Sequence, residues 1–160
     1  MEKRVMVAID ESEYSYYALI WVLENLKESI ASSPLFLFTA LPPPSTTYTS
    51  GLARSYFPLP SNTEFVHTIQ ENDKKLRCGL LEKAKDICAG RGLILQVAAI
   101  SITEDGDPGT TICDTVEKLN ISLLVLGDRG LGRIKRALIG SVSNYCVQNA
   151  KCPVLVVKKP

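Results

Sequence analysis

The strongest constraint on the fold of this chain is the regular alternation of short apolar runs with segments of helical periodicity. The apolar runs have the length of strands and contain few polar residues, which is typical of strands buried on both faces of a parallel sheet. Five such runs occur, at residues 5–9, 35–41, 93–100, 123–126 and 153–157. The sequence therefore predicts a sheet whose strands are separated by helices.

Four helical segments fill the intervals between these runs. Ser12 is predicted to cap the first helix, and an apolar stripe at four-residue spacing follows it, comprising Tyr14, Ala18, Val22 and Leu26. A long helix is predicted over residues 64–89, a third helix begins at Asp107-Pro108, and the fourth follows Gly140. The order βαβαβαβαβ predicts one α/β domain over residues 1–160, doubly wound, with a parallel sheet and helices on both faces.

Residues 42–62 do not fit this alternation, because they are rich in Pro, Ser and Thr. We expect a long and at least partly mobile loop. A tolerated insertion is the favoured interpretation, and a lid over a site is the alternative.

Composition excludes several classes of function. The net charge is +1, which gives no general electrostatic case for binding nucleic acid or a membrane surface. No apolar stretch reaches the length of a membrane span and no targeting segment is visible, so a cytoplasmic protein is expected, small enough to enter the nucleus. The five cysteines form no C-x-x-C pair and His67 is the single histidine, which argues against a disulfide framework and a zinc site.

The most informative local motif is Gly127-Asp128-Arg129-Gly130, followed nine residues later by Gly140-Ser141. Glycines let backbone N–H groups approach an anion closely, and a helix start offers unpaired N–H groups and partial positive charge. The pattern predicts a phosphate site, with the Ser141 hydroxyl either capping the helix or donating to phosphate. The alternative is that the glycines only shape a strand-to-helix connection.

The surroundings of this motif favour the nucleotide interpretation. Asp10 ends the first strand, and ligands of such sheets bind beyond the carboxyl ends of the strands, where Asp10 and Gly127 are expected to meet. Four cations lie between the glycines, at Arg129, Arg133, Lys135 and Arg136. They are either a solvated face or a source of electrostatic steering.

Catalysis has little support in the sequence. It contains no G-x4-G-K-[ST] phosphate loop and no G-x-S-x-G nucleophile turn. We therefore expect no enzyme, with weak ATP hydrolysis at most and nucleotide as a ligand.

Three stretches resemble the universal stress protein family: residues 5–13, residues 106–109 with the sequence Gly-Asp-Pro-Gly, and residues 127–160 with the G-x2-G-x9-G-[ST] pattern. The ending at 152–157 is similar to plant members. The resemblance implies a Rossmann-like or flavodoxin-like fold with five strands in the order 3-2-1-4-5. It also implies a homodimer through the last strand, about 153–157, and membership of the class that binds ATP.

The resemblance also implies a nucleotide site. Ala8, Ile9 and Asp10 would face the adenosine, with the Asp10 carboxylate on ribose hydroxyls, and Ala40 would offer backbone groups to adenine. Leu126 and Gly127 would lie under the ribose and α-phosphate. The phosphates would be held by Arg129, Gly130, Gly140, Ser141, Val142 and Ser143.

Two positions depart from the family's pattern. Asp128 stands where a small residue is usual, and a carboxylate ~4 Å from a phosphate would cost about 4 kcal/mol at an effective dielectric of ~20. That penalty would vanish if Asp128 faced solvent, and otherwise it would favour AMP over ATP or require Mg²⁺. The second departure, Thr39-Ala40 in place of His-Val, is expected to change only packing near adenine.

The leading hypothesis is a dimeric stress-response protein that binds ATP or AMP and acts as a nucleotide-responsive switch. The alternative is a nucleotide-independent, redox-regulated chaperone or interaction module. Protein partners of unknown identity are expected in addition to the nucleotide.

Overall fold

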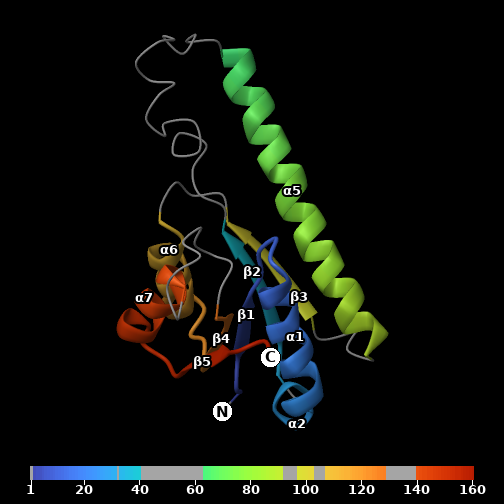
Figure 1. Cartoon of the computed structure of the whole chain (residues 1–160), viewed down its shortest axis with the longest axis vertical. Helices are drawn as coiled ribbons and strands as arrows, with labels where there is room; N and C mark the ends of the chain where they lie inside the picture. Colours follow the sequence, from blue (N-terminus) through green and yellow to red (C-terminus); the bar gives the residue numbers. More distant parts are fainter. Residues whose placement is uncertain (1, 32, 41–62, 92–96, 103–106, 129–139) are drawn as a thin grey trace.

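The fold is a parallel sheet between two layers of helices, seen in a computed structural model that describes residues 2–31, 33–40, 63–91, 97–102, 107–128 and 140–160 (Figure 1). The sheet has five strands in the order β3-β2-β1-β4-β5, and every neighbouring pair is parallel. The strands are β1 (Val5–Ala8), β2 (Leu35–Ala40), β3 (Val97–Ile102), β4 (Leu123–Gly127) and β5 (Val154–Val157). The predicted α/β class and the implied strand order agree with this arrangement.

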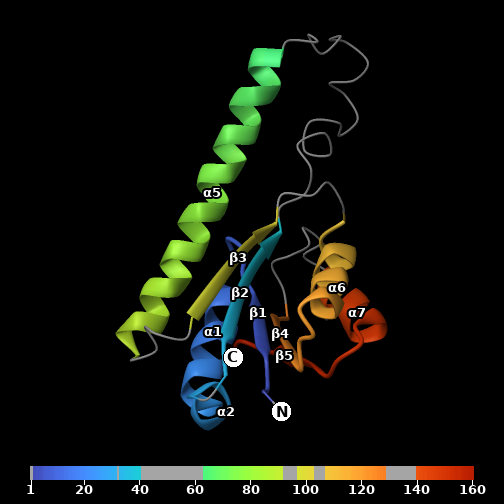
Figure 2. The ribbon, with the colours of Figure 1, turned by 180° about the vertical axis from the view of Figure 1, so that it is seen from behind.

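The helices divide between the two faces of the sheet (Figures 1 and 2). One face is covered by α1 (Glu13–Asn25), α2 (Lys27–Ala31) and α5 (Thr63–Gly90), and the other by α6 (Pro108–Lys118) and α7 (Ser141–Asn149). Strand β1 serves both layers, because its side chains alternate. Val5, Val7 and Ile9 belong to the core under α1 and α5, whereas Met6 and Ala8 belong to the core under α6 and α7.

The first helix ends at Leu26, the last residue of its predicted apolar stripe, and a second short helix that was not predicted follows it. Leu26 has φ −114° and ψ 26°, so α1 ends there and α2 begins one residue later. The N–H of Leu26 still donates to Val22 O at 2.8 Å, and Ile30 N–H donates to Leu26 O at 3.1 Å. The interruption is therefore a bend that lets both Val22 and Ile30 remain buried.

Two other element boundaries differ from the prediction. The third strand is described at Val97–Ile102, so the predicted run at 93–100 was placed too early at its carboxyl end. Leu119 caps the end of α6, and Asn120 then adopts φ 54°, a left-handed conformation that Asn tolerates. The turn brings the chain back to β4 through Ile121 N–H, which donates to Val116 O at 2.9 Å.

The described residues place four chain positions at the carboxyl edge of the sheet. These are Asp10, Ala40, Ile102 and Asp128, which follow or end β1, β2, β3 and β4. The predicted loop at 42–62 lies outside the described residues. No helix in the described part of the chain is long and apolar enough to cross a membrane.

Candidate functional site at the carboxyl edge of the sheet

Asp10 is held in a fixed position where β1 gives way to α1. Its Oδ1 accepts hydrogen bonds from both the N–H and the hydroxyl of Ser12, the former at 2.8 Å. Its own N–H donates to Ser15 Oγ at 3.1 Å, and Ser12 caps α1 as predicted. The pattern Asp-x-Ser-x-x-Ser thus supports the carboxylate, although sequence reasoning identified only the capping role of Ser12.

The second oxygen of Asp10 has no such support. The residue is 6% exposed, and Oδ2 has no hydrogen-bond partner among the described residues. Buried carboxylate oxygens are normally paired, so an unpaired one requires an explanation. One explanation is a ligand that donates a hydrogen bond there.

Gly127 brings β4 against the first turn of α1. A Cβ at this position would lie 2.8 Å from both the carbonyl carbon and the carbonyl oxygen of Tyr14. These are backbone atoms, so a side chain would have to displace the helix. The close approach accounts for glycine here without any ligand, which supports the structural alternative for this one glycine of the motif.

Asp128 is fixed by its backbone at both sides. Its N–H donates to Val157 O of β5 at 3.1 Å, and its carbonyl accepts from Gly140 N–H at 2.7 Å. The residue is 7% exposed, and Oδ1 has no partner among the described residues. The possibility that Asp128 faces solvent is therefore wrong, because β5 and the start of α7 hold it in the interior.

The amino-terminal end of α7 lies next to Asp128. The N-cap of this helix is Gly140, and no side chain caps the helix start. Ser141 is instead the first helical residue and is exposed, so the capping role considered for it is wrong. Gly140 has φ −56°, which every residue type can adopt. The Ser143 hydroxyl donates to Gly127 O at 2.8 Å, so it ties α7 to the end of β4.

The register of the sheet aligns the candidate residues in one row. Ala8 pairs with Phe38 and Val7 with Val125, so continuing each strand places Ala40, Asp10 and Asp128 side by side. Alternation points all three toward the α6 and α7 face, since Ala8, Phe38 and Leu126 belong to that core. The opposite direction of Gly127, toward Tyr14, agrees with this assignment of Asp128.

Thr39 carries a third unpaired oxygen at this edge, but on the face of α1 and α5, because Leu35 and Leu37 belong to that core. Its side chain is fully buried at the end of β2, and Oγ1 has no partner in the described part of the chain. Sequence reasoning treated Thr39 only as a packing difference. Its position in the sequence, a hydroxyl residue next to the end of a predicted buried strand, could have identified it as a candidate polar group at this edge.

Ten of the twelve predicted site residues lie in the described chain. The structure gathers them at the carboxyl edge and the adjoining start of α7: Ala8, Ile9, Asp10, Ala40, Leu126, Gly127, Gly140, Ser141, Val142 and Ser143. Arg129 and Gly130 lie outside the described residues, as do Arg133, Lys135 and Arg136. The edge offers backbone N–H donors from α7 and unpaired oxygen acceptors from the strands, which suits a ligand carrying both an anion and hydroxyl groups.

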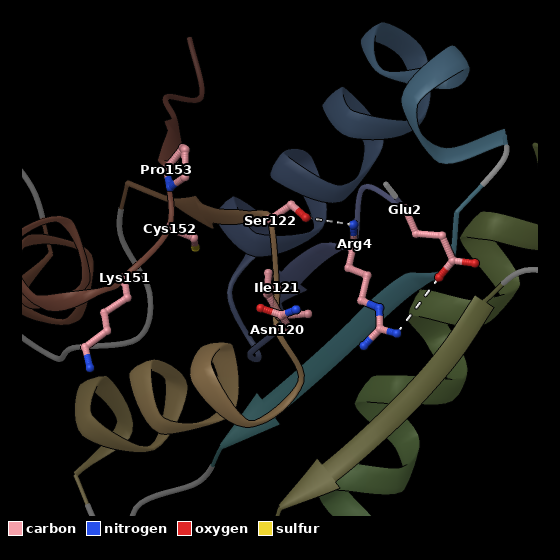
Figure 3. Close-up of a pocket in the computed structure, with 8 residues that line it drawn as sticks. All are labelled: Glu2, Arg4, Asn120, Ile121, Ser122, Lys151, Cys152 and Pro153. Carbon is pink, nitrogen blue, oxygen red and sulfur yellow. Dashed lines mark hydrogen bonds and ion pairs between the residues drawn. The ribbon is translucent and has the colours of Figure 1, made fainter.

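A pocket of about 440 Å³ lies at the opposite, amino edge of the sheet (Figure 3). Its lining comes from the starts of β1, β4 and β5, and includes Arg4, Ser122 and Lys151. The charged groups are already engaged: Arg4 pairs with Glu2 at 3.9 Å and Lys151 with Glu117 at 3.0 Å. This pocket is concave, but its charged side chains are already paired within the protein. We therefore favour the carboxyl edge, where buried oxygens have no partner among the described residues, as the candidate site.

Four cysteine thiols are shielded from solvent chemistry. Burial raises the pKa of Cys88 to about 11 and raises the pKa of Cys113, Cys146 and Cys152 above the usual value. These groups therefore keep their protons at neutral pH, and the thiol is a poor nucleophile. Of the five cysteines, Cys78 alone is exposed.

Comparisons with known proteins bear on the whole chain. Residues 1–158 match the Universal stress protein family. The universal stress protein YxiE of Bacillus subtilis is 31% identical over 158 residues, covering 99% of this chain and 100% of YxiE.

Two solved structures share the fold. A universal stress protein family protein from Arabidopsis thaliana with AMP bound has a TM-score of 0.64 and 24% identity, covering 99% of this chain and 92% of that one. The universal stress protein from Archaeoglobus fulgidus in complex with dAMP has a TM-score of 0.64 and 19% identity, covering 99% of this chain and 100% of that one. At these identities the similarity establishes the common fold.

Proposed function

The chain belongs to the universal stress protein family, and from this premise we propose that it binds an adenine nucleotide, AMP or ATP, at the carboxyl edge of its sheet. The observation that carries the proposal is two buried carboxylate oxygens with no partner among the described residues, Asp10 Oδ2 and Asp128 Oδ1, with Asp128 bonded through its carbonyl to the start of α7. Binding of AMP and dAMP by two proteins of the same fold supports it.

The proposed binding mode gives each group one role. Asp10 Oδ2 accepts a hydrogen bond from a ribose hydroxyl, while Oδ1 stays bonded to Ser12. The backbone at Ala40 contacts adenine, and the first N–H groups of α7 hold phosphate oxygens, since helix starts favour anions. The Ser143 hydroxyl proton is already donated to Gly127 O, so Ser143 would contribute its backbone N–H.

The proposal makes the nucleotide a regulatory ligand and not a substrate. We propose that binding orders the edge of the sheet and so changes contacts with protein partners in a stress response. A slow loss of phosphate from bound ATP would be incidental. We therefore expect the parent protein to hydrolyse ATP no faster than the Asp10→Ala variant does.

Thermal unfolding of the purified protein tests the proposal directly. At ~100 times its Kd a nucleotide stabilises a protein by about 2.7 kcal/mol, which corresponds to several degrees in Tm for a chain of this size. AMP and ATP should each raise Tm in the parent protein and fail to do so in Gly140→Val, whose side chain would obstruct the start of α7. Gly79→Val is the matched control, because a Cβ there meets no atom within 4 Å. If neither nucleotide raises Tm in the parent, the proposal is rejected.

We also propose that the switch is a homodimer formed through β5. This strand is at the edge of the sheet, and its apolar side chains are only partly buried up to Val157. An edge strand of this kind can pair with a second copy. Val156→Lys should shift the molar mass measured by light scattering from dimer to monomer. Val147→Lys, on the exposed face of α7, should leave it unchanged.

The redox-regulated alternative receives no support from the described thiols. Four of the five have a raised pKa, whereas regulatory cysteines normally have a lowered one. We therefore keep nucleotide binding as the single proposed function.

A further inference from the structure

The pocket at the amino edge of the sheet contains a guanidinium that is firmly positioned and only partly used. The backbone of Arg4 is fixed against the start of β4, because its N–H donates to Ser122 Oγ at 3.2 Å and its carbonyl accepts from the N–H groups of Ser122 and Leu123 at 2.8 and 3.2 Å. Arg4 Nη1 donates to Leu119 O at 2.8 Å, and within the described residues the guanidinium makes no other hydrogen bond. An arginine side chain has several further N–H donors, so most of its bonding capacity remains for a ligand.

Glu2 indicates which chemical group this guanidinium attracts. Its Oε2 lies 3.9 Å from Arg4 Nη2, close enough for an ion pair and too far for a hydrogen bond (Figure 3). The Glu2 side chain is 65% exposed and that of Arg4 is 40% exposed, and an ion pair of this kind contributes little free energy. A carboxylate that formed two parallel hydrogen bonds with Arg4 would be held more strongly and would replace Glu2.

A second cation lies on the other side of the same pocket. Figure 3 shows Lys151 and Arg4 at opposite ends of the lining, with Ile121 and Cys152 between them. Lys151 pairs with Glu117 at 3.0 Å, but both side chains are at least half exposed, so this ion pair is also weak. Ile121 is buried and Cys152 is half-buried, so the middle of the lining is apolar. The volume of about 440 Å³ is within the range of small-molecule sites.

We propose that this pocket binds a small organic dianion, a dicarboxylate whose two acid groups are joined by a short apolar chain. One carboxylate replaces Glu2 on the Arg4 guanidinium, and the other replaces Glu117 on Lys151. The chain between them lies against Ile121 and the other apolar groups of the lining. This site is independent of the proposed nucleotide site, which lies at the opposite edge of the sheet.

Titration with succinate, glutarate and adipate tests the proposal, followed by nuclear magnetic resonance of the nitrogen-labelled protein. These three dicarboxylates differ in chain length, and acetate is the single-carboxylate control. Sodium chloride holds the ionic strength constant, so that general screening does not change during the titration. We expect saturable shifts at Arg4, Ser122 and Lys151. The tightest dicarboxylate should have a Kd at least ~10-fold below that of acetate, since a second charge-assisted hydrogen bond contributes at least that factor.

Two substitutions in the pocket should change the affinity in opposite directions. Arg4→Gln should raise the Kd of the tightest dicarboxylate at least ~10-fold, and Arg4→Lys, which keeps the charge and loses the planar fork, should also raise it. Glu2→Gln should lower the Kd ~2- to 5-fold, because it removes a weak ion pair that competes with the ligand. Glu82→Gln is the matched control, since it makes the same charge change at an exposed position on α5 and should leave the Kd within ~1.5-fold of the parent value.

Three results would each overturn the proposal: no saturable shift with any of the dicarboxylates, acetate binding as tightly as the best of them, or equal effects of Glu2→Gln and Glu82→Gln. The increase in Tm caused by AMP is measured on the same proteins. It persists if only the dicarboxylate site fails. If only the proposed nucleotide site fails, the increase is absent and the dicarboxylate titration is unaffected.

Discussion

The two edges of the sheet differ in how completely their polar groups are bonded. At the amino edge, Arg4 Nη1 donates to Leu119 O at 2.8 Å, and Lys151 pairs with Glu117 beside the pocket. At the carboxyl edge, buried oxygens of Asp10, Thr39 and Asp128 have no partner in the described chain. Concave shape and unmet bonding capacity thus point to opposite edges of this sheet, and the proposed function follows the second.

The difference follows from the direction of the helices. In a parallel α/β sheet, helices begin at the carboxyl edge and end at the amino edge, so the two edges receive opposite ends of the helix dipole. Arg4 reaches the carbonyl of Leu119, which caps the end of α6, and Lys151 pairs with an acid in the last turn. The cations of the amino edge are thus used by the protein itself, whereas no bond within the described residues uses the N–H groups of the first turn of α7 after Gly140.

The largest expected effect concerns the close approach at the carboxyl edge. Gly127→Ala should lower the free energy of unfolding by about 3 kcal/mol, because the new methyl would meet the Tyr14 backbone at 2.8 Å and overpacking of this kind strains the fold. Urea unfolding measures it. Gly79→Ala, in the exposed part of α5 where a Cβ meets nothing, should stabilise by about 0.5–1 kcal/mol. An unchanged stability in Gly127→Ala would mean that α1 and β4 are not in this contact.

A smaller effect is expected on binding when the carboxyl edge loses its proposed ribose acceptor, Asp10. Asp10→Asn keeps an oxygen for the two bonds from Ser12 and replaces the unpaired oxygen by a donor. We expect the affinity for AMP to fall by about 2 kcal/mol, the usual contribution of a hydrogen bond to a charged group, with the fold retained. Calorimetric titration compares the two proteins. An unaltered Kd would show that the unpaired oxygen is not part of the site.

The amino edge should respond in the opposite way, with a change in stability and none in binding. Arg4→Gln removes the guanidinium bond to Leu119 O and should cost about 1 kcal/mol of unfolding free energy. The Tm increase caused by AMP should stay the same as in the parent. A reduced AMP response would break the distinction between the edges and point to the pocket as a binding site.

The smallest effect is expected at the exposed ion pair of the same pocket. Lys151→Gln removes a 3.0 Å contact with Glu117 between two well-exposed side chains, and such pairs contribute under about 0.5 kcal/mol. Urea unfolding in low and high salt should show a difference from the parent that disappears as salt increases. A difference that persists at high salt would indicate that Lys151 packs against the protein through its aliphatic chain.

Local signals in the sequence predicted most of the fold. Ser12 and Asp107 are helix caps as expected, because capping depends on a few adjacent residues. The short helix α2 after Leu26 was not predicted, because the apolar stripe of the first helix ends at that residue. It arises from packing, which holds Val22 and Ile30 in the same core.

The candidate site was predictable only in part, for a related reason. The sequence identified Asp10 and Gly127 as neighbours, because both follow buried strands. The burial of Asp128 depends on bonds to Val157 and Gly140, which are distant in the sequence, so pattern alone left its orientation undecided. The unpaired state of its oxygen is likewise a property of the assembled edge.

The long helix α5 has a consequence for local dynamics. It contains 28 residues, about 42 Å, and Figure 1 shows its amino-terminal half extending past the end of the sheet. All of its described buried residues lie from Arg77 onward, and Tyr16 of α1 donates to Leu80 O at 3.4 Å. Burial of an apolar face provides most of the stability of a helix in a protein, so we expect protection of backbone amides against deuterium to be highest from Arg77 onward. Amides near the start of α5 would then exchange through local opening, and amides near its end would exchange only through global unfolding.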